Sequence, residues 1–383
     1  MAWFSEDVIY LDHNGTTPVD PAVIEAMRPF LEHEHGNPSS PHAAGVRARE
    51  ALERRRKDVA DLLGCSPPEI VFTSGGTESN NTVLKGGIDL ANPSASHIIT
   101  TAVEHPAVLN PALYLAELGA GVTVLPVDGT GRVDPDAVRE AIRPQTALIS
   151  VMLANNETGA LQPVREIARI ARERGIPVHT DAAQAVGKIP VDVHDLGVDF
   201  LSVAGHKLYA PKGVGALFVR SGRSLTPLMH GAAQEGGRRA GTESALLAAG
   251  LGEACRIAQA RLSQDMETLR RMRDRLQDLL FEGVDGLVLN GPLEERLPNT
   301  LFFCVPGVEG ARILEGVPSL HASTGAACHD RSVTLSHVLA AMGVPKEVGM
   351  GALRLTVGRS NTMEQIHEAA RLLIDVIRRM RGV

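Results

Sequence analysis

Short apolar runs alternate with helical patterns between about residue 45 and residue 220. Residues 47–63 carry apolar side chains at three- and four-residue spacing, which predicts a helix that stops at Gly64. Segments such as 164–174 show the same spacing and separate several runs typical of buried strands. This alternation predicts an α/β fold with a mostly parallel sheet and helices on both faces. The expected strands are 69–73, 97–101, 122–127, 147–153, 177–180, 200–203 and 216–219.

The last third of the chain has a different pattern. Residues 243–281 predict a long helical stretch, broken or bent, that leaves the sheet, and residues 362–380 predict an amphipathic helix that closes the chain. With no internal repeat or low-complexity linker, we expect two domains with a tight interface. Strands of a smaller α+β unit are expected at 299–305, 322–328 and 352–357. The expected division is a large domain at 16–258 and a small domain made of 1–15 and 259–383.

Composition narrows the class of protein. The chain has 383 residues, of which 44% are hydrophobic and 22% charged, as is usual for a soluble globular protein. A net charge of −7 gives no electrostatic footprint for nucleic acid or an anionic membrane. No apolar run is long enough for a membrane span, and the acidic start does not resemble a signal peptide. The four scattered cysteines form no CxxC pair, so we expect free thiols in the reducing cytoplasm.

A lysine and an aspartate follow two of the expected strands. Lys207 ends the sequence Ala-Gly-His-Lys after the run at 200–203, and Asp181 follows the run at 177–180. Open α/β folds bind ligands at this edge of the sheet. Taken singly, a helix cap and a solvated lysine are the more ordinary interpretations. Together the two residues suit pyridoxal phosphate (PLP), because the amine forms a Schiff base and the carboxylate keeps the pyridine nitrogen protonated.

Two more polar segments lie near expected strand ends. Residues 73–79, Thr-Ser-Gly-Gly-Thr-Glu-Ser, contain Gly76 and Thr77 where a helix N-terminus can bind an anion. The segment matches neither a Walker A loop nor GxGxxG, and a plain tight turn is an equal alternative. His105, after the strand at 97–101, could stack on a flat ring or exchange a proton. An ordinary loop histidine fits the same pattern.

The second half of the chain adds an amide, two arginines and a thiol. Asn156 lies in Asn-Asn-Glu-Thr-Gly, which is either a turn or a segment that presents an amide to a ring substituent. Arg354 and Arg359 lie in or beside an expected strand, and a guanidinium matches the carboxylate of an amino acid. Cys328 stands between small and polar residues, which predicts a strand running into an exposed loop over 329–335. A thiol there could be a nucleophile.

As a set, these motifs resemble those of PLP-dependent cysteine desulfurases of the class V aminotransferase family, which have the fold-type-I architecture. The resemblance runs from Tyr-Leu-Asp-His-Asn-Gly-Thr-Thr-Pro at 10–18, through Gly-Asn-Pro-Ser-Ser at 36–40, to Arg-Leu-Thr-Val-Gly-Arg at 354–359. It is specific because many separated motifs occur in the family's order and spacing. It implies a large PLP-binding domain and a smaller α+β domain that carries the catalytic cysteine.

The resemblance also implies a role for each matching residue. Lys207 would be the Schiff-base lysine and the base, His105 would stack on the ring, and Cys328 would take the sulfur as a persulfide. The residues implied to bind the cofactor are Gly76, Thr77, His105, Asn156, Asp181, Gln184, His206, Lys207 and, from the partner subunit of a homodimer, Thr242. Those implied to bind the substrate are Asn14, Asn37, Asn156 and Arg354, and no metal is implied.

Two segments differ from the family's usual pattern. Ala204 stands where the family often has a serine, so one hydroxyl for the phosphate is missing. The cysteine segment reads Thr-Gly-Ala-Ala-Cys-His-Asp where Ser-Gly-Ser-Ala-Cys-Thr-Ser is common. Together with Leu-Ala-Asn-Asn-Glu-Thr-Gly at 153–159, this segment is similar to selenocysteine lyases.

The activity that the resemblance implies is conversion of L-cysteine to L-alanine by a cytoplasmic homodimer. Sulfane sulfur would pass through a persulfide to an acceptor protein such as a scaffold or a sulfur carrier. The first alternative is a selenocysteine lyase acting on L-selenocysteine, and the second is a class V transaminase. A non-catalytic nucleotide-binding or scaffold protein that uses the glycine-rich loop alone is a third.

Overall fold

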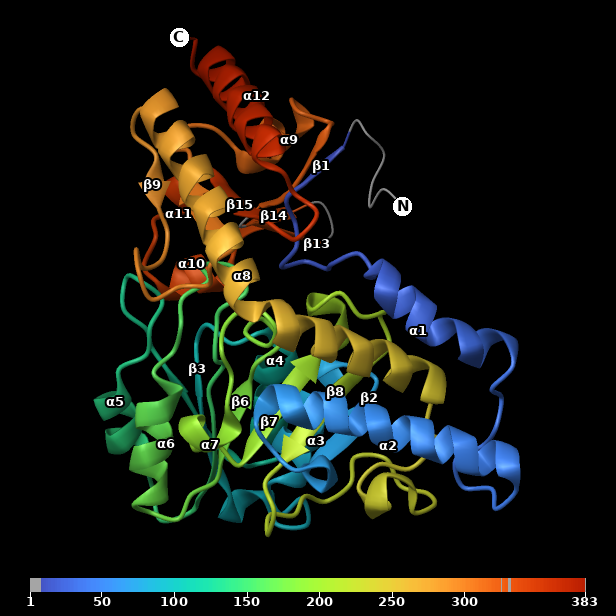
Figure 1. Ribbon diagram of the computed structural model, residues 1–383. Helices are drawn as coiled ribbons and strands as arrows, with labels where there is room; N and C mark the ends of the chain where they lie inside the picture. The colour runs from blue at the N-terminus through green and yellow to red at the C-terminus, as the bar shows by residue number, and fades with distance from the viewer. Residues whose placement is uncertain (1–7, 325, 330–331, 383) are drawn as a thin grey trace.

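Seven strands form the central sheet of the larger unit: β2 (Ile70–Thr73), β3 (His97–Thr101), β4 (Gly121–Leu125), β5 (Thr146–Ser150), β6 (Val178–Asp181), β7 (Phe200–Ala204) and β8 (Gly215–Val219). The computed structural model describes residues 8–324, 326–329 and 332–382, without the side chains of 326–329 and 332–333 (Figure 1). The strand order is β2-β8-β7-β6-β5-β3-β4. All pairs from β7 to β4 are parallel, and β8 is antiparallel to both of its neighbours. The predicted mostly parallel α/β sheet is thus confirmed.

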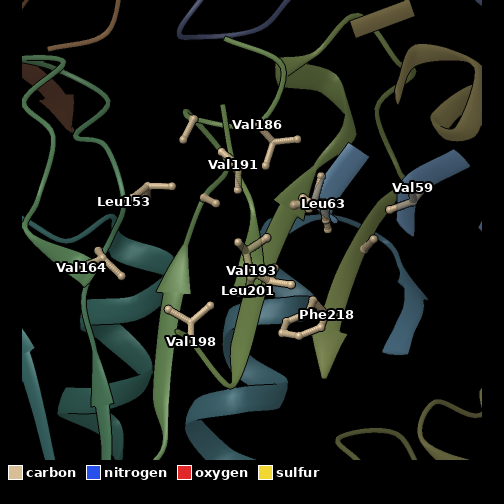
Figure 2. Close-up of a cluster of buried hydrophobic side chains, with 14 of the residues drawn as sticks. Val59, Leu63, Leu153, Val164, Val186, Val191, Val193, Val198, Leu201 and Phe218 are labelled. Carbon is tan, nitrogen blue, oxygen red and sulfur yellow. The ribbon is translucent and has the colours of Figure 1, made fainter. Parts of the chain in front are cut away.

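Helices cover both faces of this sheet. They include α2 (Ala43–Leu63), α3 (Gly76–Gly86), α4 (Pro106–Glu117), α5 (Pro135–Ala141), α6 (Val164–Arg172) and α7 (Val193–Leu196). Helix α1 (Pro21–Glu32) packs on the long helix α8 (Ala245–Gly283). Because side chains alternate along a strand, neighbours in β2 pack on different helices. Phe72 lies in the apolar cluster that includes Leu63 of α2, whereas Val71 lies in the cluster that includes Leu84 of α3. Figure 2 shows part of the first cluster, with Leu63 and Leu201 among its side chains.

Helix α8 (Ala245–Gly283) joins the larger unit to a smaller one. It contacts α1 and α2 near its beginning and α12 (Met363–Arg381) near its end. Its residue Ala258 belongs to the core of the larger unit, and Leu269 belongs to the core of the smaller unit. The long helix expected over 243–281 is confirmed as one continuous element, and Figure 1 shows it changing direction between its two halves.

The smaller unit is built on a four-stranded sheet in the order β12-β15-β10-β9. Its strands are β9 (Val288–Leu289), β10 (Thr300–Cys304), β12 (Ser323–Thr324) and β15 (Ala352–Thr356). Near the N-terminus, β1 (Ile9–Tyr10) pairs in parallel with β11 (Leu320–His321), so the chain start packs in this unit. Three short helices complete it: α9 (Gly310–Glu315), α10 (His337–Ala341) and α11 (Lys346–Gly349). The domain limits at residues 15/16 and 258/259 stay a prediction.

A separate hairpin carries the backbone of Cys328. Strand β13 (Ala326–His329) pairs antiparallel with β14 (Ser332–Leu335), and Cys328 lies opposite Val333. The loop expected over 329–335 is therefore wrong for residues 332–335, which return as a strand. Val333 and Leu335 alternate with polar residues there, the period of a strand, and the sequence interpretation gave this alternation too little weight.

Along the described ranges, no helix combines the length and the apolar character that a membrane span requires.

Candidate active site

The ends of strands β3, β5, β6 and β7 and the start of α3 surround a cavity of about 410 Å³, and β15 of the smaller unit closes it from the other side. It brings together all the site residues expected from the sequence except Asn37, Thr242 and Cys328. The lining residues are Asn14, Gly15, Gly76, Thr77, Asn80, His105, Ala107, Met152, Ala154, Asn156, Asp181, Ala183, Gln184, Ala204, His206, Lys207 and Arg354.

Lys207 follows β7 in a single turn of 3-10 helix, which ends the strand and points its chain toward the cavity. Its Nζ donates to the backbone carbonyl oxygens of Asn14 at 2.6 Å and Gly15 at 2.7 Å. Burial, and next the charge of Arg354, lower the pKa of Lys207 from 10.5 to about 8. The lysine is thus held by neutral acceptors and gives up its proton more easily than a solvated lysine.

Asp181 is the last residue of β6 and is only 6% exposed. Its Oδ2 accepts a hydrogen bond from Asn80 Nδ2 at 2.7 Å, and its Oδ1 accepts one from the backbone N–H of Ala183 at 2.9 Å. Each oxygen has a second lone pair for a donor in the cavity. A fixed carboxylate of this kind suits a cationic N–H group.

His105 is the N-cap of α4 and lines the cavity. Its Nδ1 accepts a hydrogen bond from the backbone N–H of Ala107 at 3.0 Å, so the proton of the neutral ring is on Nε2. Burial lowers the pKa of His105, which keeps the ring neutral. The cap therefore determines both the position and the tautomer of this imidazole.

The start of α3 and His206 also line the cavity. Gly75, with φ 149°, leads into the helix, and Gly76 and Thr77 begin it. A Cβ on Gly76 would lie 3.3 Å from the Cβ of Ala204, so the glycine keeps this corner open. Burial lowers the pKa of His206 to about 4, so its imidazole is neutral here. Free helix N–H groups beside a neutral imidazole can bind an anion such as a phosphate.

Arg354 reaches the cavity from β15. Its guanidinium donates to Asp12 Oδ1 at 2.8 Å, to Ser323 Oγ at 3.0 Å and to the backbone oxygen of Asn156 at 3.1 Å. Its Nε is buried and has no hydrogen-bond partner among the described residues. The side chain is held in place and keeps donor capacity, as an arginine that binds a carboxylate requires.

Two expected site residues lie elsewhere, and a third cannot be placed. Asn37 is exposed, and its side chain accepts a hydrogen bond from the backbone N–H of Ser39 at 2.9 Å. Thr242 is exposed beside a second hollow of about 180 Å³, lined in part by Ser74. The side chain of Cys328 lies outside the described residues. The described end of its hairpin leads to Ser336, whose Oγ donates to Glu157 Oε2 at 2.5 Å.

The structure also brings in residues that sequence reasoning missed. Asn80 lies one turn into α3 and bonds to Asp181 across 101 positions in the sequence. Asp12 pairs with Arg354, and Lys188 is buried behind Gln184. The position of Asn80 three residues after Thr77 was a possible signal, since both lie near the start of one helix. The other two contacts depend on the packing of distant segments.

Sequence comparison places the chain in a family. The profile of the aminotransferase class-V family matches residues 9–368. A protein named cysteine desulfurase IscS from Dictyoglomus turgidum is 45% identical over 380 residues, which are 98% of this chain and 96% of that protein. Another of the same name from Methanosarcina thermophila is 44% identical and covers 98% of this chain and 93% of its own length.

Solved structures agree with this placement. A NifS-like protein superimposes with a TM-score of 0.90 at 36% identity, covering 98% of this chain and 100% of its own. A structure described as SspA in complex with cysteine has a TM-score of 0.79 at 35% identity, covering 91% of this chain and 98% of its own. The chain therefore belongs to the class V aminotransferase family and, within it, to the cysteine desulfurases.

Proposed function

We propose that the cavity binds PLP and that the chain converts L-cysteine to L-alanine, with the sulfur passing to Cys328. The observation that carries the proposal is the arrangement of three groups around one cavity: Lys207 with a lowered pKa, Asp181 with a fixed carboxylate, and Arg354 with a free buried N–H. A transaminase and a nucleotide-binding scaffold are less well supported, because relatives that match nearly the full chain are named cysteine desulfurase.

The residues present fit this cofactor. Lys207 would bind its aldehyde, Asp181 its pyridine nitrogen, and His105 would lie against the ring. Gly76, Thr77 and His206 would hold the phosphate, and Asn156 and Gln184 would face the ring oxygen. When bound, PLP supplies a carbonyl for the substrate amine and an electron sink for the α-carbon.

The chain's own groups provide binding and proton transfer. Arg354 would bind the substrate carboxylate, because it lines the cavity and its Nε has no hydrogen-bond partner among the described residues. Lys207 Nζ would remove the α-proton, since its pKa of about 8 leaves part of the amine unprotonated near neutral pH. Asp181 would pair with the ring nitrogen through its fixed carboxylate.

The sulfur would leave by nucleophilic attack. The Cys328 thiolate attacks the substrate sulfur, an S–S bond forms as the C–S bond breaks, and the carbon keeps the electron pair and gains a proton. The products are alanine and a persulfide on Cys328, so no external oxidant is needed. The other three cysteines are poor candidates: Cys255 and Cys304 are fully buried, and burial raises the pKa of Cys65 to about 12.

The remaining parts of the proposal concern partners. We infer a homodimer, because Thr242 does not line the cavity of its own chain and the family resemblance assigns it to the phosphate site of the partner subunit. The persulfide sulfur would go to an acceptor protein, a scaffold or a sulfur carrier, in the reducing cytoplasm.

The proposal is tested by product analysis on the purified protein with added PLP. We expect equal amounts of alanine and sulfane sulfur from cysteine, and a visible band near roughly 400–430 nm, the usual range for a lysine-bound PLP. Borohydride should fix the cofactor on Lys207. Selenocysteine is assayed in parallel. Turnover of selenocysteine alone, or PLP fixed on another lysine, would contradict the proposal.

A further inference from the structure

A second buried lysine lies behind the cavity, and the chemistry described above does not use it. Lys188 is 6% exposed and does not line the cavity. Its Nζ donates to Gln184 Oε1 at 2.7 Å and to Asn14 Oδ1 at 3.0 Å. Both acceptors are neutral amide oxygens, and no carboxylate of the described residues forms an ion pair with Lys188. A buried amine without a counter-ion is costly to protonate, so the role of Lys188 requires an explanation.

The contacts of Lys188 settle which way the Gln184 amide faces. Gln184 Nε2 donates to the backbone oxygen of Asn14 at 2.9 Å, and Lys188 occupies the oxygen side of the same amide. Lys188 is the only donor to Gln184 Oε1 among the described residues, whereas Asn14 Oδ1 also accepts from Asn299 Nδ2 at 3.1 Å. The second N–H of Gln184 is therefore free for the cavity that Gln184 lines.

The same group of bonds joins the two units. The backbone oxygen of Asn14 accepts from both Gln184 and Lys207, and its side-chain nitrogen donates to Thr300 Oγ1 at 2.9 Å. Its backbone N–H donates to Thr356 Oγ1 at 3.0 Å. Thr300 and Thr356 lie in β10 and β15, and β15 also carries Arg354. Lys188 thus lies where the cavity wall meets the strands of the smaller unit.

We propose that Lys188 is a positioning residue that holds the Gln184 amide with an N–H toward the cavity. The proposal rests on the proposed function, since the N–H of Gln184 would meet the ring oxygen of PLP. Burial, and next the charges of Lys207 and Arg354, lower the pKa of Lys188 well below that of a solvated lysine. Its two donated hydrogen bonds persist in either protonation state.

Lys188→Met tests this role, because methionine fills a similar volume and donates no hydrogen bond. Gln184 Oε1 then has no donor, and its amide is no longer held. We expect PLP to bind about two- to tenfold more weakly, the equivalent of one lost hydrogen bond. We also expect a shift in the absorption maximum of the bound cofactor in the absence of substrate. Lys212→Met, which removes an exposed cation near His206, should change neither quantity.

A double variant separates positioning from a general effect on folding. If Lys188 acts through Gln184, Lys188→Met should weaken PLP binding by less than about twofold when Gln184→Met is already present. Equal effects in both backgrounds would overturn the proposal. So would a Lys188→Met protein with a lower melting temperature but unchanged PLP affinity and spectrum.

Lys188→Gln, which keeps one amide donor, is measured in place of Lys188→Met if the methionine variant does not fold. It should then lose less affinity than the two- to tenfold expected for Lys188→Met. A wild-type protein that binds no PLP would contradict the proposed function itself, whereas an unaltered Lys188 variant beside a normal wild type contradicts this inference alone.

Discussion

The proposed role of Lys207 as a base rests on where the fold places its amine. Its amine contacts two carbonyl oxygens and lies near the Arg354 cation, and burial takes it out of water. Removing a charge from water disfavours the protonated form of an amine, so the environment and not the residue type makes this lysine reactive near neutral pH.

The first prediction is the pH dependence of PLP capture by the apoprotein. The reactive form is the free amine, and the pKa of Lys207 is about 8 instead of 10.5. The rate constant should therefore rise between about pH 7 and 9 and level off above that. Stopped-flow absorbance measures it, with N-acetyl-lysine amide as the control, whose rate should still be rising at pH 10. A protein rate that follows the control would contradict the assignment.

The second prediction concerns Ala204, which lines the cavity beside Gly76. Ala204→Ser adds a hydroxyl at the proposed phosphate site and should slow PLP loss on dialysis. One net hydrogen bond of about 0.5–1.5 kcal/mol corresponds to roughly a two- to tenfold slower loss. Ala204→Gly adds no donor and should not slow it. Unchanged or faster loss from the serine variant would mean that another donor already fills the place.

Single residues differ in how far the sequence predicts them. Lys207 and Asp181 follow apolar runs directly, so the rule for sheet edges was sufficient to bring them together. Asn80 and Lys188 could not be assigned in this way, because their partners come from other segments. A hydrogen bond between segments far apart in sequence has no local pattern.

At the scale of elements, one residue can serve both the fold and the site. His105 caps α4 through the Ala107 N–H, and the same bond sets the tautomer of its ring. The sequence predicted the position of this residue after a strand. It did not predict the cap, because histidine is not among the usual N-cap residues.

The third prediction separates these two roles. Asparagine is a good N-cap residue and alanine is a poor one, and neither side chain has a ring. His105→Ala should lower the free energy of unfolding by about 1 kcal/mol relative to His105→Asn. Both variants should lose the stacking partner and slow cysteine turnover by similar factors. Denaturation and initial-rate assays measure the two effects, and an asparagine variant as active as wild type would contradict the assigned ring contact.

The hairpin of β13 and β14 is an element that the sequence did not predict in full. The run Val-Thr-Leu before Ser336 has strand periodicity, but small and polar residues around Cys328 favoured a loop in the sequence interpretation. The seven-stranded sheet was predictable because its short apolar runs alternate regularly with helical patterns, and α8 because its helical pattern is long. A short two-stranded pair has too few residues to show a clear alternation of apolar and polar positions.

At the scale of the whole molecule, two units meet at the active site. The larger unit supplies Lys207 and Asp181 to the cavity, and the smaller one supplies Arg354. Asn14 bonds to both, through Gln184 on one side and Thr300 on the other. The geometry of the cavity therefore depends on the hydrogen bonds between the two units as well as on the apolar core of each.

The fourth prediction is that the active form is a homodimer. Sedimentation equilibrium should give twice the mass of one chain at assay concentrations. Thr242→Ala should weaken PLP binding although Thr242 lies outside the cavity of its own chain, because it is assigned to the partner's site. Thr226→Ala, a change outside both hollows, is the control. An active monomer, or an unaltered Thr242→Ala protein, would contradict this arrangement.

The central claim is that sulfur leaves cysteine by way of Cys328, and mass spectrometry of the protein after incubation with cysteine tests it most directly. With PLP bound and no reductant or acceptor present, the account predicts one added sulfur on the peptide that contains Cys328. Cys328→Ser should bind PLP and cysteine normally, gain no sulfur and release no sulfide. An added sulfur on Cys65, Cys255 or Cys304, or full cysteine turnover by the serine variant, would contradict it.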